Sequence, residues 1–360
     1  MKLLLMVLLL IILGLLMTLT ISCGKIFDYS ETPKLLEFTK SSGVGVNRIL
    51  LITLHPPSFL GNYYYNDSYS IITEQNTKEY ALSNQVYTIG VGAKDAKKIN
   101  EQLYIIKTGG MTQAGTDLQS LLVLDKNTFS INKEILLTTT PFKMTNDLAK
   151  IYIANINNSL SIVDLTDFSI KNVDLNLPSI KNILYFDNKI YIIYDQTLTI
   201  INIETCKIEK SITLLNKADS ITQYKNNLYI SEDNGFIEVI NTLTESSIAK
   251  ISFNEEVNQI EITPEGKGFV IGAGNTRKIL TFNADSYQIN EPINLVGFRI
   301  DNFVSMTLDH QGQLWIVCNY VSPGFLGTSN IEFIYIADIN TGQIKGPYKT
   351  NTTTEVILTL

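Results

Sequence analysis

Cysteine, histidine and positive charge are scarce in this sequence, which has 3 Cys, 2 His and a formal net charge of −7 in 360 residues. Two of the cysteines, Cys206 and Cys318, stand alone in different parts of the chain, so they make neither a disulfide framework nor a metal site. His55 and His310 have no evident partner base or nucleophile. The sequence also has no cluster of basic residues that could contact the phosphates of a nucleic acid. We therefore expect no catalytic constellation, no metal, no cofactor and no nucleic-acid partner.

Helical periodicity is also missing after the first 22 residues. Hydrophobic residues make up 45% of the chain and charged residues 18%, which is enough apolar material for a large core. Ile, Tyr, Val and Thr are frequent, and these residues favour strands. The sequence is therefore expected to fold as an all-β protein.

One hairpin pattern recurs along the chain and is clearest in Leu198–Ile212, where apolar residues alternate on both sides of a polar turn. Copies begin at Leu121, Leu160, Ile237, Ile279 and Phe333. An Asp or Asn marks the start of each turn, at Asp125, Asp164, Asn202, Asn241, Asn283 and Asp338. A hairpin returning about every forty residues is the signature of a propeller blade. The markers are expected to bond the following backbone amides.

Two further strands precede each hairpin, the second with an aromatic near its start, as in Tyr191 and Trp315. This pattern predicts blades of four strands, named a to d from the axis outward, and a ring of seven blades; eight are possible if residues 34–50 form more than a tether. The first copy, from Arg48, lacks an obvious a-strand. We expect Thr353–Leu360 to supply it and so to close the ring.

The N-terminus has the pattern of a secretory signal sequence: Lys2, an apolar run over Leu3–Leu16, and Cys23 directly after small or moderately apolar residues. Leu19–Cys23 resembles a bacterial lipobox, although Thr20 occupies a position where Leu is usual. The resemblance implies a signal peptide over residues 1–22, lipidation of Cys23, a tether over 23–46 and a propeller over 47–360. An uncleaved membrane anchor is the alternative, because Leu3–Ser22 could just span a bilayer.

The connection between strands b and c is about ten residues longer in blades seven, one and two than in the others. These blades are neighbours in a closed ring, so the long connections should cluster in one sector. They contain the candidate partner-binding residues Phe59, Leu60, Tyr63, Tyr64, Tyr65, Phe325 and Leu326. Pro and Gly set the turns there, so these side chains are either displayed to a protein partner or folded back as a cap on the blades.

Other motifs favour simple structural interpretations. His310 falls in a predicted a–b turn, and Ser231–Gly235 lacks the acidic register of a calcium loop and is expected to be a b–c turn. The glycines Gly90, Gly92, Gly272 and Gly274 are not followed by a helix that could complete a phosphate cradle.

The repeat resembles that of the surface-layer and quinoprotein-like propellers, a fold-level similarity that covers most of residues 47–360. Quinoproteins repeat a tryptophan docking motif, whereas this chain has 1 Trp, so a quinone enzyme is not expected. A propeller on a lipid anchor is similar to the BamB-like accessory lipoproteins of outer-membrane β-barrel assembly. That resemblance implies a non-catalytic scaffold facing the periplasm. The alternatives are a surface-exposed lipoprotein that binds a host or envelope ligand, and an unrecognised propeller enzyme.

Overall fold

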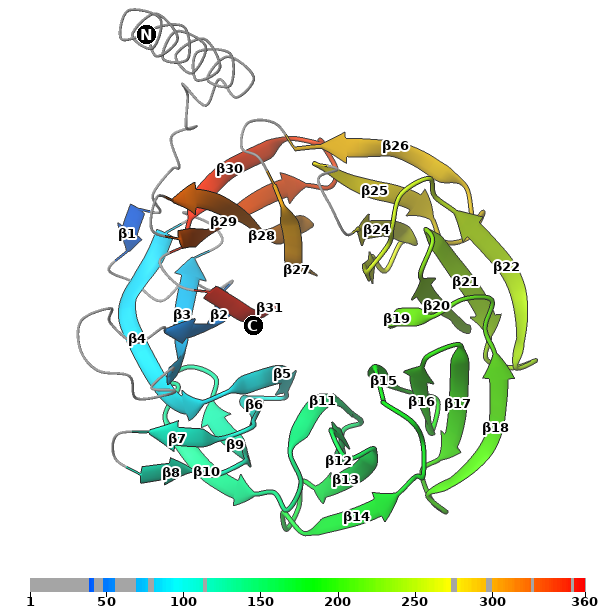
Figure 1. The fold of residues 1–360 in the computed structure, drawn as a ribbon, viewed down its shortest axis with the longest axis horizontal. Helices are drawn as coiled ribbons and strands as arrows, with labels where there is room; N and C mark the ends of the chain where they lie inside the picture. Colours follow the sequence, from blue (N-terminus) through cyan, green and yellow to red (C-terminus); the bar gives the residue numbers. More distant parts are fainter. Residues whose placement is uncertain are drawn as a thin grey trace, which may run out of the picture. The chain divides into compact units, whose positions relative to one another are not determined.

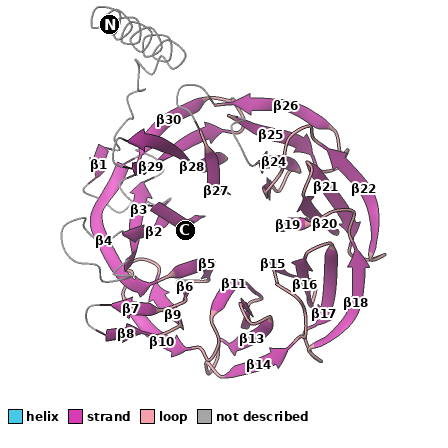
Figure 2. Cartoon of the chain, in the orientation of Figure 1, coloured by secondary structure: helices cyan, strands magenta, loops and turns pink. Residues whose placement is uncertain are grey.

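The computed structural model describes residues 39–41, 48–55, 69–76, 81–112, 115–272, 277–295, 300–324, 327–350 and 353–359. Their regular elements are all β-strands, joined by turns and loops (Figure 2). No helix in this described part is long and apolar enough to cross a membrane. All of it belongs to the compact unit Leu35–Leu360; a second unit, Met1–Lys34, lies outside the described residues.

Blades three to six are four-stranded antiparallel sheets in simple a-b-c-d order (Figure 1). Blade three contains β11 (Pro141–Asn146), β12 (Lys150–Asn155), β13 (Ser159–Asp164) and β14 (Ile170–Asp174), and blade four contains β15 (Asn182–Phe186), β16 (Lys189–Tyr194), β17 (Thr197–Asn202) and β18 (Lys207–Thr213). Blade five contains β19 (Ala218–Tyr224), β20 (Asn227–Glu232), β21 (Phe236–Asn241) and β22 (Ser246–Ser252), and blade six contains β23 (Gln259–Ile262), β24 (Lys267–Ile271), β25 (Lys278–Asn283) and β26 (Ile289–Asn294). We call these four blades the regular sector.

Blades seven, one and two each depart from that plan, and we call them the irregular sector. Blade seven contains β27 (Asn302–Leu308), β28 (Gln313–Gly324), β29 (Gly327–Asp338) and β30 (Ile344–Lys349). Blade one contains β31 (Thr353–Thr359), β2 (Arg48–His55), β3 (Tyr69–Asn76), β4 (Ala81–Val91) and β1 (Thr39–Ser41). Blade two contains β5 (Ala93–Ile99), β6 (Gln102–Lys107), β9 (Ser120–Asp125) and β10 (Ile131–Leu136), with the small sheet β7 (Gly110–Thr112) and β8 (Gly115–Asp117) between β6 and β9.

The propeller class is confirmed, with one difference in strand number. Six blades have four strands, and blade one has five because β1 pairs in parallel with β4, Thr39 opposite Ala81. The segment expected as a tether, residues 23–46, thus contributes an outer strand to blade one. That strand is too short to show an alternating pattern, which is why the sequence did not predict it.

The ring is closed by the C-terminal strand, as expected. β31 pairs antiparallel with β2, and Ile357 lies opposite Leu51. The innermost strands then contact one another in a complete circuit, in the order β31, β5, β11, β15, β19, β23, β27 and back to β31 (Figure 1). The buried carboxylate of Glu332 on β29 holds the closing strand, because it accepts hydrogen bonds from the Thr354 amide at 2.7 Å and the Thr350 hydroxyl at 3.1 Å.

A separate hydrophobic cluster fills each gap between adjacent blades. In blade one, for example, Leu50 and Ile52 pack toward blade two, and Ile49 and Leu51 pack toward blade seven. Both faces of an inner strand are therefore buried, and each fully buried side chain of this size contributes about 2 kcal/mol. This explains why the b-strands read as continuous apolar runs.

The b-strand aromatics, including Tyr152, Tyr191, Tyr229 and Trp315, are almost fully buried. Two of them have hydrogen-bond partners at the end of the ring where a joins b: the Tyr152 hydroxyl donates to Asp147 at 2.7 Å, and Trp315 Nε1 donates to Asp309 at 3.0 Å. The same Asp309 accepts the Gln313 amide at 2.8 Å, so one carboxylate shapes the turn and supports the core.

The c–d turns confirm the interpretation of the marker residues. In each one the Asp or Asn side chain accepts backbone amides two or three residues ahead, as Asn202 does from Glu204 and Thr205, both at 3.0 Å. The fourth residue after the marker has a positive φ; these residues are Phe129 (56°), Phe168 (62°), Cys206 (55°), Glu245 (48°), Tyr287 (61°) and Gly342 (71°). The turn is therefore set by the marker side chain, because five of these residues are not glycine.

Candidate functional site

All of the residues expected from the sequence to be functional lie outside the described residues. They are the proposed lipidation site Cys23 and the candidate partner-binding residues Phe59, Leu60, Tyr63, Tyr64, Tyr65, Phe325 and Leu326. The structure therefore bears on this site through the segments that flank it. These segments lie at the b–c end of the ring, the end at which strand b connects to strand c.

A long loop was expected between strands b and c of blade seven, but most of the extra residues extend the two strands instead. The antiparallel ladder of β28 and β29 continues beyond the blade to the pair Gly324 and Gly327. Its base is fixed to the preceding a-strand segment, because Asp301 accepts the Val321 amide at 2.8 Å. Tyr320 is buried at this base, whereas Val321 is 38% exposed. The described part of this β-ribbon thus ends at Gly324 and Gly327, and Phe325 and Leu326 between them lie outside the described residues.

In blade two the insertion is fastened by a buried lysine. Lys107, at the end of β6, forms ion pairs with Asp117 at 2.6 Å and with Glu134 at 2.9 Å. The other oxygen of Asp117 accepts the Val91 amide of blade one at 2.7 Å. Because Asp117 ends β8, this network ties the insertion of blade two to the outer strand of blade one.

The glycines at this junction have a steric role. Gly90 has φ +95°, and a Cβ atom there would lie 2.6 Å from Asp117 Oδ2 and 2.8 Å from Lys107 Nζ. Only glycine leaves room for the ion pair at this distance, so Gly90 belongs to the fastening of the insertion rather than to a phosphate loop.

In blade one, β2 ends at His55 and β3 begins at Tyr69, so residues 56–68 connect strands b and c. The insertions of the three blades thus emerge at the same end of three successive blades. In the regular sector, by contrast, β20 ends at Glu232 and β21 begins at Phe236. The expected clustering of the long connections is borne out by the positions of their flanking strands.

The weaker chemical candidates occupy structural positions. His310 is exposed in the a–b turn of blade seven, and Cys206 is a turn residue. Cys318 lies fully buried in β28, where burial raises the pKa of its thiol well above the usual value. Both thiols are free. A buried, protonated thiol is a poor nucleophile, so the structure gives Cys318 a packing role.

Blade five contains a buried carboxyl pair that was not predicted from the sequence. Glu232 is 0% exposed and Glu238 is 3% exposed. One oxygen of Glu232 accepts the Asn216 amide at 2.8 Å, and the other accepts no hydrogen bond from the described groups. Burial and the neighbouring Glu238 carboxyl raise the pKa of Glu232 to about 8, which is consistent with a proton held between the two groups. The repeat could have indicated that Glu232 is buried. It occupies the same place in its blade as Lys107 and Asn155, the buried polar residues that end β6 and β12.

Within the described ranges, no group of three or more His, Cys, Asp or Glu side chains could hold a metal ion. Comparison with protein-family models finds none that matches this chain, and no curated protein matches it either. The feature that bears on function is therefore the propeller itself, a ring with an irregular sector and a regular sector.

Proposed function

We propose that this protein is a non-catalytic scaffold of the bacterial cell envelope, held to a membrane by lipid on Cys23. It captures a protein partner with the b–c end of the irregular sector. The finer form of the proposal is an accessory role in outer-membrane β-barrel assembly, similar to that of BamB-like lipoproteins.

The observation that carries this proposal is the restriction of the insertions to three adjacent blades at one end of the ring. The ribbon of β28 and β29 and the sheet of β7 and β8 add backbone that the fold does not need, because blades three to six close without it. The Lys107–Asp117 pair and the Val321–Asp301 bond fix their bases. Fixed strands beside a group of apolar residues support the proposal, because protein interfaces combine an ordered backbone with apolar side chains.

The test is affinity purification of the tagged full chain from crosslinked cells, compared with the double variant Phe59→Ser and Phe325→Ser. We expect the variant to lose a specific envelope protein while its melting temperature stays within about 2 °C of the parent chain. A large loss of stability would instead identify the two residues as a cap on the blades. The matched control is Leu243→Ser, which changes an exposed apolar residue (70% exposed) in a c–d turn of the regular sector.

The second candidate is a surface-exposed lipoprotein that binds a host or envelope ligand through the same sector. The same insertions support this candidate, because they are compatible with a propeller on either side of the outer membrane. Protease treatment of intact cells separates the two: a chain shielded by the outer membrane survives, whereas a surface-exposed chain is shaved. Recovery of a barrel-assembly factor in the purification would favour the first candidate.

A further inference from the structure

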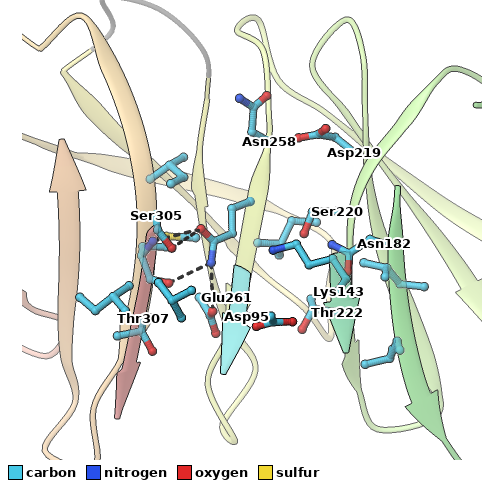
Figure 3. A pocket seen from close by; sticks show the side chains of 18 of the residues that line it. Asp95, Lys143, Asn182, Asp219, Ser220, Thr222, Asn258, Glu261, Ser305 and Thr307 are labelled. Atoms are coloured by element: carbon cyan, nitrogen blue, oxygen red, sulfur yellow. Dashed lines mark hydrogen bonds between the residues drawn. The ribbon is translucent and has the colours of Figure 1, made fainter. Parts of the chain in front are cut away.

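A polar cavity of about 640 Å³ lies on the axis of the ring, between the innermost strands of all seven blades (Figure 3). This volume is within the range of about 300 to 1,000 Å³ that small-molecule sites occupy. The cavity is separate from the b–c insertions and has no part in the proposed scaffold function. Its side chains come from strands whose register is known, so their arrangement can be followed layer by layer.

Strand register places the lining side chains in two rings. Residues of the first ring are the a-strand residues that pair with the b-strand aromatics or, in blade one, with Leu51. This ring contains Lys97, which pairs with Tyr104, and Glu261, which pairs with Phe269. The remaining members of this ring are uncharged: Thr145, Leu184, Thr222, Thr307 and Ile357. The second ring, two residues earlier along six of the seven strands, contains Asp95 and Lys143, with Asn182, Ser220, Gln259 and Ser305.

Three of the charged groups around the cavity are already satisfied. Asp95 accepts the backbone amides of Ala96 at 2.9 Å and Met144 at 3.0 Å. Lys181 and Asp219, on neighbouring blades, form an ion pair at 2.7 Å. These contacts hold adjacent blades together. Among the described side chains that line the cavity, they leave Lys97, Lys143 and Glu261 as the charges without a strong partner.

Among the described groups, Glu261 has only one weak contact, from the Gln259 amide at 3.5 Å. Gln259 is committed elsewhere, because its amide donates to the Met306 carbonyl at 2.9 Å and its oxygen accepts the Met306 amide at 3.0 Å. Burial raises the pKa of Glu261 to about 7, and the positive charge of Lys97 opposes that rise. The carboxyl is therefore short of donors at neutral pH.

Lys97 and Glu261 lie on opposite sides of the axis. From β5 to β23 the circuit of inner strands passes β31 and β27 in one direction and β11, β15 and β19 in the other (Figure 1). Among the described contacts no ion pair joins Lys97 to Glu261, and Lys143 has neither a hydrogen bond nor an ion pair from its amine. Figure 3 shows Lys143 and Glu261 among the side chains gathered between the inner strands.

We propose that the axial cavity binds a small zwitterion, a molecule with one carboxylate and one ammonium group. The carboxylate faces Lys97 and Lys143, and the ammonium group faces Glu261. The hydroxyl and amide side chains of the two rings contact the remainder of the ligand. The reason is complementarity: a ligand of one charge would leave the opposite side of the cavity unpartnered, whereas a zwitterion satisfies both sides at once.

The test is isothermal titration of the full chain with 4-aminobutyrate and 6-aminohexanoate, each compared with the carboxylate and the amine of equal length. We expect at least one of the two amino acids to bind at least ten-fold more tightly than either singly charged analogue. Equal binding by the amino acid and its analogues, or no binding by either amino acid, would overturn the proposal.

Two variants assign the ends of the ligand. Glu261→Gln keeps the shape of the side chain and should remove the preference for the amino acid over the plain carboxylate. Lys143→Met should weaken the amino acid at least ten-fold and leave the plain amine unchanged. The control is Lys207→Met on the outer strand β18, which should change neither. Melting curves confirm that each variant is folded, and unchanged binding in both folded cavity variants would contradict the assignment.

Discussion

The regular and irregular sectors share one end of the ring and differ at the other. At the end where a joins b and c joins d, Asn202 in blade four and Asp338 in blade seven make the same turn with the same backbone contacts. At the b–c end, blades seven, one and two have a ribbon, a connection of residues 56–68 and a small sheet, whereas fewer residues separate strands b and c in blades three to six. The fold therefore needs only one end of each blade to be regular, and the other end is free to vary.

The largest expected effect comes from the irregular sector, where the chain closes. Deletion of residues 353–360 removes the inner strand of blade one and exposes the cores toward blades two and seven. We expect a chain that no longer unfolds in one cooperative transition, because an open ring leaves two unpaired blade surfaces. Circular dichroism melting measures this, and an unchanged melting curve would show that closure contributes nothing.

A smaller but specific loss is expected for Glu332→Ala. This buried carboxylate accepts hydrogen bonds from the Thr354 amide and the Thr350 hydroxyl. Its removal leaves both of these donors without that acceptor beside the closing strand. The free energy of unfolding should fall by about 3 kcal/mol in urea denaturation. Glu204→Ala, at an exposed turn of the regular sector, is the matched control and should change it by less than about 0.5 kcal/mol.

In the regular sector, the Glu232–Glu238 pair should make stability depend on pH. The folded-state pKa of Glu232 is raised to about 8 from an ordinary value of 4.5, so the folded chain binds more protons than the unfolded chain between these values. Stability should therefore fall as pH rises from about 4.5 through 8.

Glu232→Gln mimics the protonated form and isolates this effect. The variant should match the parent chain near pH 5 and exceed it by on the order of 2 kcal/mol near pH 8.5, measured by urea denaturation at each pH. Glu261→Gln is measured alongside, because Glu261 also has a raised pKa and adds to the slope. Parallel pH profiles for the parent and Glu232→Gln would contradict a shared proton.

The smallest effect should be the same in both sectors. Asn202→Ala and Asp338→Ala each remove the side chain that accepts two amides of a c–d turn. We expect each to lower the melting temperature by about 2 °C, since the turn backbone is otherwise unchanged. The turn amides of Thr341 and Asn340 lower the pKa of Asp338, so the effect of Asp338→Ala should disappear as pH falls through that lowered value, whereas that of Asn202→Ala should not. Unequal losses at neutral pH would show that the two sectors differ at this end too.

The sequence predicted the elements whose residues have local causes. The markers from Asp125 to Asp338, the hairpins they begin and the closing strand at 353–359 follow from alternation and turn chemistry, and the structure contains them. The ribbon in blade seven was read as a loop because Pro323 and Gly324 usually break strands. In a two-stranded extension one edge of each strand has no neighbour, so Pro323 can pair with Thr328 at no cost to a sheet.

The polar interior could not be predicted in this way. Glu261 and Glu238 occupy alternating positions in strands, and a single sequence does not say whether such a position faces solvent, a neighbouring blade or the axis. Only the closed ring brings Lys97 and Glu261, from blades two and six, to opposite walls of one cavity. Such contacts depend on how many blades there are and on where the ring closes, which are properties of the whole chain.

The pairing of β2 with β31 also determines when the molecule can be finished. Residues near position 50 leave the ribosome long before their inner neighbour near position 357 is made. Until β31 is made, blade one therefore lacks its inner strand, and β2 presents an unpaired edge to any strand it meets. Contacts of such long sequence separation form slowly, so completing the circle is the expected late step of folding. A protein built in this way remains an open arc with an exposed strand edge until β31 has been made.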